Sequence, residues 1–329
     1  MPSASWLTRS YSAIPAEQAH MKKIDPSKIK TYSVKSRPSK VRLDDFAMPY
    51  QKNGSYQDFF SSLPNTLASK NLKEVTAAVV QARKGMRPVM LGMGAHSIKV
   101  GLNRVVIDLM ERRIITSLSL NGAGIIHDFE LAFIGQTSED VDREILSGAF
   151  GMAEETGSML NQAIKSAAKD EGIGAAVGRM IQTGDFPYKD HSLLAAGSRL
   201  GVPVTVHIAI GTDIIHMHPS FDGKATGAAA HRDFLTFCSL VSDLEGGVYI
   251  NLGSAVLLPE IFLKAVTLCR NLGYTLQHLT TVNMDFVQHY RPNTNVVCRP
   301  TQDGGRGYAI TGHHEIMFPL LAAAVIDQS

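Results

Sequence analysis

A glycine-containing turn followed by a histidine and an acid is the clearest candidate for chemistry in the sequence. Asn121-Gly122-Ala123-Gly124 follows an apolar stretch that begins at Ile114, and helical spacing resumes at Ile125. Glycines let backbone N–H groups approach a ligand closely, and a helix N-terminus attracts negative charge. His127 and Asp128 would stand on the first turn of this helix. The stretch predicts a ligand-binding turn, and an ordinary strand-to-helix turn is the alternative.

His127 is the residue on which we expect activity to depend most. A helix N-terminus disfavours the imidazolium, so a neutral ring able to accept a proton is expected there. Asp213 and Asn121 would face the same substrate, because both follow predicted strands whose carboxyl ends meet at one edge of a sheet. A core or capping role for His127 is the alternative.

Two further glycine-containing turns end predicted strands and are expected to hold a cofactor. Backbone close to these glycines can contact phosphate groups directly. With the first turn, the candidate residues are Gly92, Gly94, His96, Gly122, Ala123, Gly124, Gly253, Ser254 and Asn283.

Strands and helices alternate along the chain, which is typical of a parallel sheet covered on both faces. The predicted strands span 88–91, 114–120, 202–207, 247–252, 277–282 and 308–310. The predicted helices span 69–84, 98–113, 231–244, 259–272 and a last one from His314, with a helical insertion over 137–201. Loops are expected over 219–230 and 288–303, and a phosphate-binding nest over 304–307. The predicted fold is α/β, doubly wound and mostly parallel.

Composition narrows the class of partner. The 329 residues include 32 basic and 30 acidic side chains, a net charge of +2, which argues against nucleic acid or an anionic membrane surface. No apolar run reaches the roughly 18 residues that a spanning helix needs. Three cysteines without a paired motif suit a reducing compartment and buried thiols. We therefore expect a cytoplasmic protein that binds a small molecule.

The N-terminal sixty residues differ in composition from the rest. Residues 1–20 are expected to be an extension that precedes a more natural start at Met21. Residues 21–60, rich in Lys, Arg, Ser and Pro, predict an arm that lies over a neighbouring subunit, and residues 61–329 predict one domain.

From Pro88 to Ile326 the order and spacing of several motifs resemble deoxyhypusine synthase, an NAD-dependent enzyme that moves an aminobutyl group from spermidine to a protein lysine. The motifs are Leu91-Gly92 with Ile98-x-x-Gly101, Asn121 to Gly124 with Asp128, Val202-Pro203-Val204 with Thr212-Asp213 and His218, Ile250 to Gly253, Arg291-Pro292, and Phe318 to Leu321. The resemblance implies an NAD-binding domain, a homotetramer with sites at subunit interfaces, and cofactor contacts at His313 and His314.

The residues that face the substrate in that family are replaced here. The family's catalytic lysine lies in a Trp-Gly-Lys, where this chain has Cys298-Arg299-Pro300. Its paired glutamates correspond to Ile126 and His127, and Asp213 is the one polyamine carboxylate with a clear counterpart. Two serines of the first loop become Ala95 and Lys99. Since buried ammonium groups need several carboxylates, spermidine is not the expected substrate.

Two functions remain open at this stage. The first is an NAD-dependent transferase or oxidoreductase that acts on an amine or a related small molecule. The second is a relative without redox chemistry, which either binds a metal through histidines or acts as a non-catalytic binding protein. The histidines considered for a metal are His96, His127, His216, His218, His313 and His314.

Overall fold

The computed structural model describes residues 22–329, and contacts divide the chain after Arg42. The first unit contains two single helical turns, η1 (Pro26–Lys28) and η2 (Val34–Ser36). The expected extension over residues 1–20 lies outside the described residues.

The second unit begins at Leu43, so it overlaps the predicted arm over residues 43–60. It opens with η3 (Leu43–Asp45) and the helix α1 (Tyr56–Ser62). The α1 helix packs on the last helix, α13 (His314–Gln328), where the Tyr56 hydroxyl donates to the Leu320 carbonyl at 2.6 Å. Phe60 is buried in the same place.

Six parallel strands form one sheet in the order β3-β2-β1-β4-β5-β6. Their bounds are β1 Val89–Met93, β2 Ser117–Asn121, β3 Val204–His207, β4 Val248–Leu252, β5 Thr280–Asp285 and β6 Arg306–Thr311. This is the strand order of doubly wound dinucleotide-binding folds, in which the direction of winding reverses between β1 and β4. The predicted fold class is confirmed.

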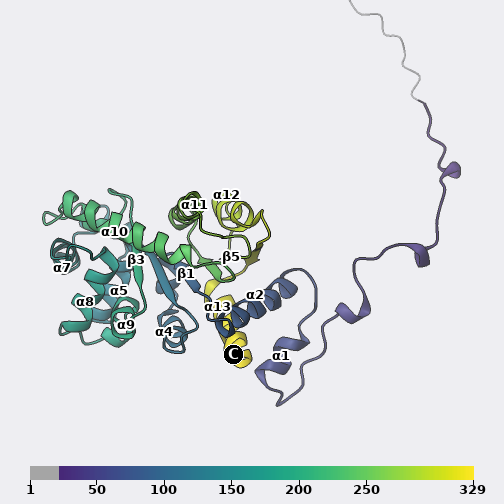
Figure 1. Cartoon of the computed structure of the whole chain (residues 1–329), viewed down its shortest axis with the longest axis horizontal. Helices are drawn as coiled ribbons and strands as arrows, with labels where there is room; N and C mark the ends of the chain where they lie inside the picture. The colour runs from purple at the N-terminus through teal and green to yellow at the C-terminus, as the bar shows by residue number, and fades with distance from the viewer. Residues whose placement is uncertain (1–21) are drawn as a thin grey trace, which may run out of the picture. The chain divides into compact units, whose positions relative to one another are not determined.

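Helices cover both faces of the sheet (Figure 1). Those not yet given are α2 Leu67–Lys84, α3 His96–Lys99, α4 Asn103–Glu111, α5 Gly122–Ile134, α6 Val141–Glu144, α7 Glu154–Lys165, α8 Ile173–Thr183, η4 Lys189–His191, α9 Leu193–Leu200, η5 Ile214–His216, α10 Gly223–Ser242, α11 Leu257–Asn271, α12 Tyr290–Pro292, η6 Asn293–Cys298 and η7 Arg299–Thr301. The run from α6 to α9 confirms the helical insertion between β2 and β3.

Successive side chains of the central strands point alternately into two apolar layers, one on each face of the sheet. Met90 and Tyr249 point into a layer shared with α10 and α11, which contains Phe237 and Phe262. The neighbouring residues of β1 and β4 point into the larger layer, with α2, α4, α5 and α13. Side chains buried on both faces explain why these strands read as continuous apolar runs.

Several predicted boundaries are wrong for identifiable reasons. The helix predicted over 98–113 is split into α3 and α4 at Gly101, whose φ is +80°. The loop predicted over 219–230 contains the start of α10, because the Asp222 side chain caps the amides of Lys224 and Ala225. The loop predicted over 288–303 contains α12, η6 and η7. The predicted nest over 304–307 partly belongs to β6, which begins at Arg306.

The cysteine prediction holds for two residues and fails for the third. Cys238 and Cys269 are buried, but Cys298 is exposed on η6, and all three are free thiols. Over residues 22–329, none of the helices has both the length and the apolar character that crossing a membrane requires.

Candidate functional site

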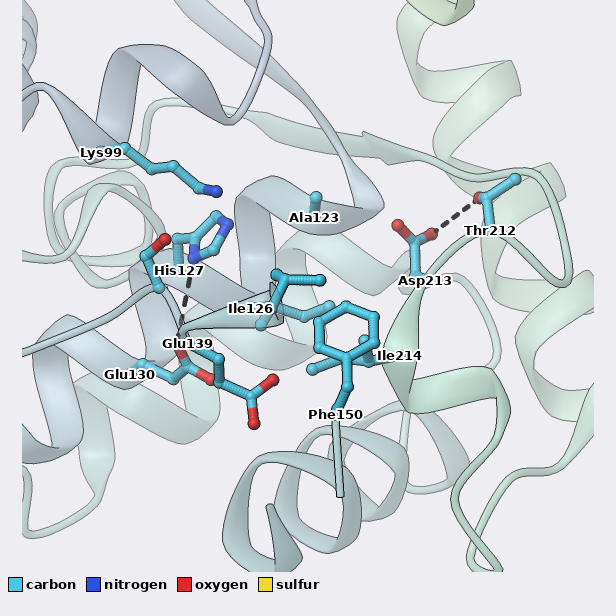
Figure 2. Close-up of a pocket in the computed structure, with 12 residues that line it drawn as sticks. Lys99, Ala123, Ile126, His127, Glu130, Glu139, Phe150, Thr212, Asp213 and Ile214 are labelled. Atoms are coloured by element: carbon cyan, nitrogen blue, oxygen red, sulfur yellow. Dashed lines mark hydrogen bonds and ion pairs between the residues drawn. The ribbon is translucent and has the colours of Figure 1, made fainter. Parts of the chain in front are cut away.

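A cavity of about 180 Å³ lies at the carboxyl ends of β2 and β3 (Figure 2). His127 and Asp213, two of the three predicted catalytic residues, both line it, as does the predicted cofactor residue Ala123. The complete lining is Lys99, Ala123, Ile126, His127, Glu130, Ser138, Glu139, Val141, Phe150, Thr212, Asp213 and Ile214. Charged side chains lie around an apolar centre formed by Ile126, Phe150 and Ile214 (Figure 2).

The start of α5 sets the geometry of one end of this cavity. Asn121 caps the helix, because its Oδ1 accepts the Gly124 amide at 3.0 Å. The helix therefore begins at Gly122, three residues before the predicted start, and His127 lies on its second turn. A Cβ on Gly122 would lie 2.0 Å from Asp213 Oδ2, so only glycine lets this carboxylate lie against the helix start.

His127 is held by a chain of hydrogen bonds that fixes its tautomer. Thr137 donates its hydroxyl proton to Glu130 Oε2 at 2.6 Å, and Thr137 Oγ1 lies 2.6 Å from His127 Nδ1. Because the hydroxyl has one proton, His127 Nδ1 must carry the hydrogen that joins them. Nε2 is left as a proton acceptor, and this nitrogen points away from Glu130 into the cavity (Figure 2).

Burial keeps the His127 ring neutral. Burial is the largest cause that lowers its pKa, to about 4, and the nearby Lys99 ammonium adds to the effect. The lowered pKa favours the neutral form expected from sequence, with burial as its largest cause. Burial also raises the pKa of Asp213, while His216, Thr212 and the Ala123 amide oppose that shift.

Two glutamates of the cavity were missed by sequence reasoning. Glu130 lies three residues after His127 on the same helical face, a spacing that could have revealed it. Its two oxygens accept from Thr137 and Thr156. Glu139 comes from the segment after α5 and accepts the Gly151 amide at 2.9 Å, which fixes the segment that carries Phe150. No local pattern links Glu139 to the cavity.

Lys99 extends from α3 over His127, with its ammonium facing the cavity (Figure 2). Among the described residues it has no ion-pair partner. At the other end of the cavity, the Asp213 carboxylate faces the same space.

Asp128, placed beside the ligand by sequence reasoning, is instead a structural residue. It is fully buried and accepts from Asn103, the Ser192 hydroxyl, and the amides of Leu193 and Leu194 at the start of α9. Burial raises its pKa to about 6 in opposition to these bonds. It joins α4, α5 and α9.

The second group of predicted residues lies where the winding reverses between β1 and β4. A Cβ on Gly94 would lie 2.4 Å from the Gly253 carbonyl oxygen, and one on Gly253 would lie 2.5 Å from the His314 ring. His314 is buried, and among residues 22–329 neither of its ring nitrogens has a hydrogen-bond partner, although Nε2 lies 3.5 Å from Asp285 Oδ1. His96 packs against this ring, with centroids 5.5 Å apart. Close backbone and unpaired ring nitrogens fit a polar ligand here.

Other predicted cofactor residues have internal partners. Asn283 accepts from Asn251 and donates to Gln288, so its amide belongs to a buried network. The Ser254 hydroxyl accepts the Leu258 amide at the start of α11. Gly92 lies inside β1, not in a turn. His313 stacks on Phe286, with centroids 6.2 Å apart, next to the His314 group.

The histidines do not converge on a metal. Within residues 22–329, no group of three or more His, Cys, Asp and Glu side chains is arranged to hold a metal ion. His127, His218 and His314 each lie against a different acid: Glu130, Glu154 and Asp285. The structure therefore gives no support to the metal-binding alternative.

No protein-family model and no curated protein matches this sequence. Solved structures of similar fold include AgrE in complex with ornithine and NAD+, with a TM-score of 0.54, 13% identity, and 82% of this chain and 35% of AgrE covered. ArgZ, an arginine dihydrolase from cyanobacteria, has a TM-score of 0.50 and 14% identity, and the match covers 80% of this chain and 34% of ArgZ. A proposed deoxyhypusine synthase from Entamoeba histolytica has a TM-score of 0.47 and 11% identity, and the match covers 85% of this chain and 96% of that protein. This chain spans about a third of AgrE and ArgZ, and the similarity shows the fold alone.

Proposed function

We propose that this protein is an NAD-binding enzyme that acts on a primary amine by hydride chemistry. One observation carries the proposal: a neutral histidine with a fixed tautomer, His127, faces a cavity between Lys99 and Asp213 at the carboxyl edge of the sheet. That edge is where doubly wound folds bind their ligands.

The dinucleotide is assigned to the place where the winding reverses. The strand order, the close approach of Gly94 to Gly253 and the unpaired nitrogens of His314 support this assignment. AgrE, whose fold is similar, was solved in complex with ornithine and NAD+. That complex agrees with the binding of a dinucleotide and an amine by a protein of this fold.

The substrate amine would bind neutral and donate a hydrogen bond to His127 Nε2, since a ring with a pKa of about 4 stays unprotonated near neutral pH. Glu130 lies 3.9 Å from Nδ1 and helps to hold the ring. Gly94, Gly253 and His314 would hold the dinucleotide, which when bound would supply hydride acceptance, so that the carbon carrying the amine would lose a hydride and become an iminium carbon. Ile126, Phe150 and Ile214 would exclude water from that carbon.

Dinucleotide retention tests the proposal. The purified protein should contain NAD by mass spectrometry, or be stabilised against heat by added NAD+ in a saturable way. A His314→Ala variant should lose that stabilisation, whereas His278→Ala, which removes an exposed histidine bonded to Glu245, should keep it. Absence of dinucleotide binding in the wild type would overturn the proposal and favour a relative without redox chemistry.

We also predict that the protein does not make deoxyhypusine. Cys298-Arg299-Pro300 stands where the resembled family has its catalytic lysine, and Cys298 is exposed on η6. An assay with NAD, spermidine and a translation-factor substrate should give no deoxyhypusine. Product formation would contradict this prediction unless Lys99 or Lys264 were shown to form the bond to the aminobutyl group.

A further inference from the structure

The charges at the two ends of the cavity specify more about the ligand than the fold does. Lys99 offers an ammonium that has no ion-pair partner in the described chain, and Asp213 offers a carboxylate at the opposite end (Figure 2). The oxygens of Glu130 are occupied by Thr137 and Thr156. Glu139 accepts the Gly151 amide through Oε2. Lys99 and Asp213 are the charged groups at the two ends of the cavity.

The distance between these ends limits the ligand's length. Asp213 lies against Gly122, and His127 is five residues farther along α5, a rise of about 7.5 Å. An extended chain of five bonds between two nitrogens, each bond about 1.5 Å long and somewhat shorter along the chain axis, covers most of that distance. The volume of about 180 Å³ is below the roughly 300 Å³ at which pockets for drug-sized ligands begin.

We propose that the substrate is an α-amino acid with a second ammonium group at the end of its side chain. Its carboxylate pairs with Lys99, its α-amino group faces His127 Nε2, and its methylene groups lie along the apolar centre. The distal ammonium pairs with Asp213. This inference rests on the proposed function for the reaction, and it adds the substrate class and two specificity-determining residues.

A simple diamine is the closest competitor, since the cavity also contains carboxylates. Lys99 decides against it, because a second ammonium beside an unpaired lysine is repelled, whereas a carboxylate there forms a charge-assisted hydrogen bond. A monoamino acid satisfies Lys99 but leaves Asp213 without a cation.

Three compounds that share the four-carbon chain from the α-carbon separate these cases: ornithine, putrescine, which lacks the carboxylate, and norvaline, which lacks the distal amine. Calorimetric titration of the full-length protein, with and without saturating NAD+, should show ornithine binding at least about tenfold more tightly than either. Tighter binding of putrescine or norvaline than of ornithine in both conditions would overturn the proposal.

Two charge-removing variants assign the two ends. Lys99→Met should weaken ornithine about tenfold and leave putrescine unchanged or tighter, while Asp213→Asn should weaken ornithine and leave norvaline unchanged. Lys84→Met and Asp170→Asn, at exposed positions that do not line the cavity, serve as controls. If Lys99→Met instead weakens NAD+ and leaves ornithine unaffected, Lys99 holds a phosphate and the proposal is wrong. NAD+ binding is measured separately, so failure of the cofactor assignment is distinguishable from failure of the substrate class.

Discussion

At the scale of single residues, His127 makes a pH-dependent contribution to stability whose sign is defined. Its pKa is about 4 in the folded protein and 6.5 when exposed, so between these values the unfolded chain binds more protons. The contribution, up to about 3 kcal/mol, is complete above pH 6.5 and is lost as the pH falls through about 4. Urea unfolding of wild type and His127→Gln from pH 7.5 to 4 should show their difference shrinking on acidification.

The difference in the free energy of unfolding between wild type and His127→Gln isolates the contribution of His127. His207 also has a lowered pKa, whereas burial raises the pKa of Asp128 to about 6 and of Asp233 to about 7, so their slopes oppose one another in either protein alone. A difference that is constant with pH would contradict the burial of a neutral His127.

Substitution of His127 by alanine tests whether the role of this residue is functional or structural. His127→Ala should abolish binding or turnover of ligand while the protein stays folded at the assay temperature, its melting temperature lowered no further than the pH-dependent contribution of the ring accounts for. A lower melting temperature with unchanged NAD+ and ornithine binding would identify His127 as a packing residue. Thermal melts with and without each ligand distinguish the two outcomes.

At the scale of elements, the meeting of α5 with the segment after β3 depends on one glycine. Gly122→Ala places a methyl group 2.0 Å from Asp213 Oδ2, so the carboxylate must leave its present position. We expect a loss of about 1–3 kcal/mol in the free energy of unfolding and weaker ornithine binding. Gly227→Ala is the control, because open space surrounds Gly227 inside α10 and alanine should stabilise that helix by about 0.5–1 kcal/mol. Equal behaviour of the two variants would show that Asp213 is not positioned by Gly122.

The elements were predictable to the extent that their signals are local. Alternating strands and helices gave the α/β class, and the apolar runs of β1, β3 and β4 located those strands. The start of α5 was misplaced because the glycines there suggest a loop, whereas the Asn121 cap and the distant Asp213 make them the first helical turn. A contact between residues that follow two different strands, such as Gly122 and Asp213, leaves no local pattern in the sequence.

The residues of the candidate site were likewise predictable only where their signals in the sequence are local. His127 and Asp213 were predictable as strand-end polar residues, and the structure brings them to one cavity. His314, expected as a cofactor contact, lies against Gly253 where the winding reverses and does not line the cavity of His127. Glu139 depends on a tertiary bond to Gly151, and its role could not be read from spacing.

At the scale of the whole molecule, we predict a homotetramer. Residues 22–42 contain isolated apolar residues and form only single helical turns, so a second subunit would supply the surface they need. Light scattering should give a mass of four chains, and deletion of residues 1–42 should lower it without changing the secondary structure. A mass of one chain for the full-length protein contradicts the prediction.

The order of the strands also bears on how the chain folds. The two central strands, β1 and β4, pair Val89 with Val248, so the middle of the sheet joins segments that are remote in sequence. Closing a loop of that length costs conformational entropy before its contacts form, and contacts between distant segments slow folding. We expect the β4–β6 half to assemble from neighbouring segments and the β1–β4 seam to close late. Until then each half exposes an unpaired apolar edge, so refolding yield should fall as protein concentration rises.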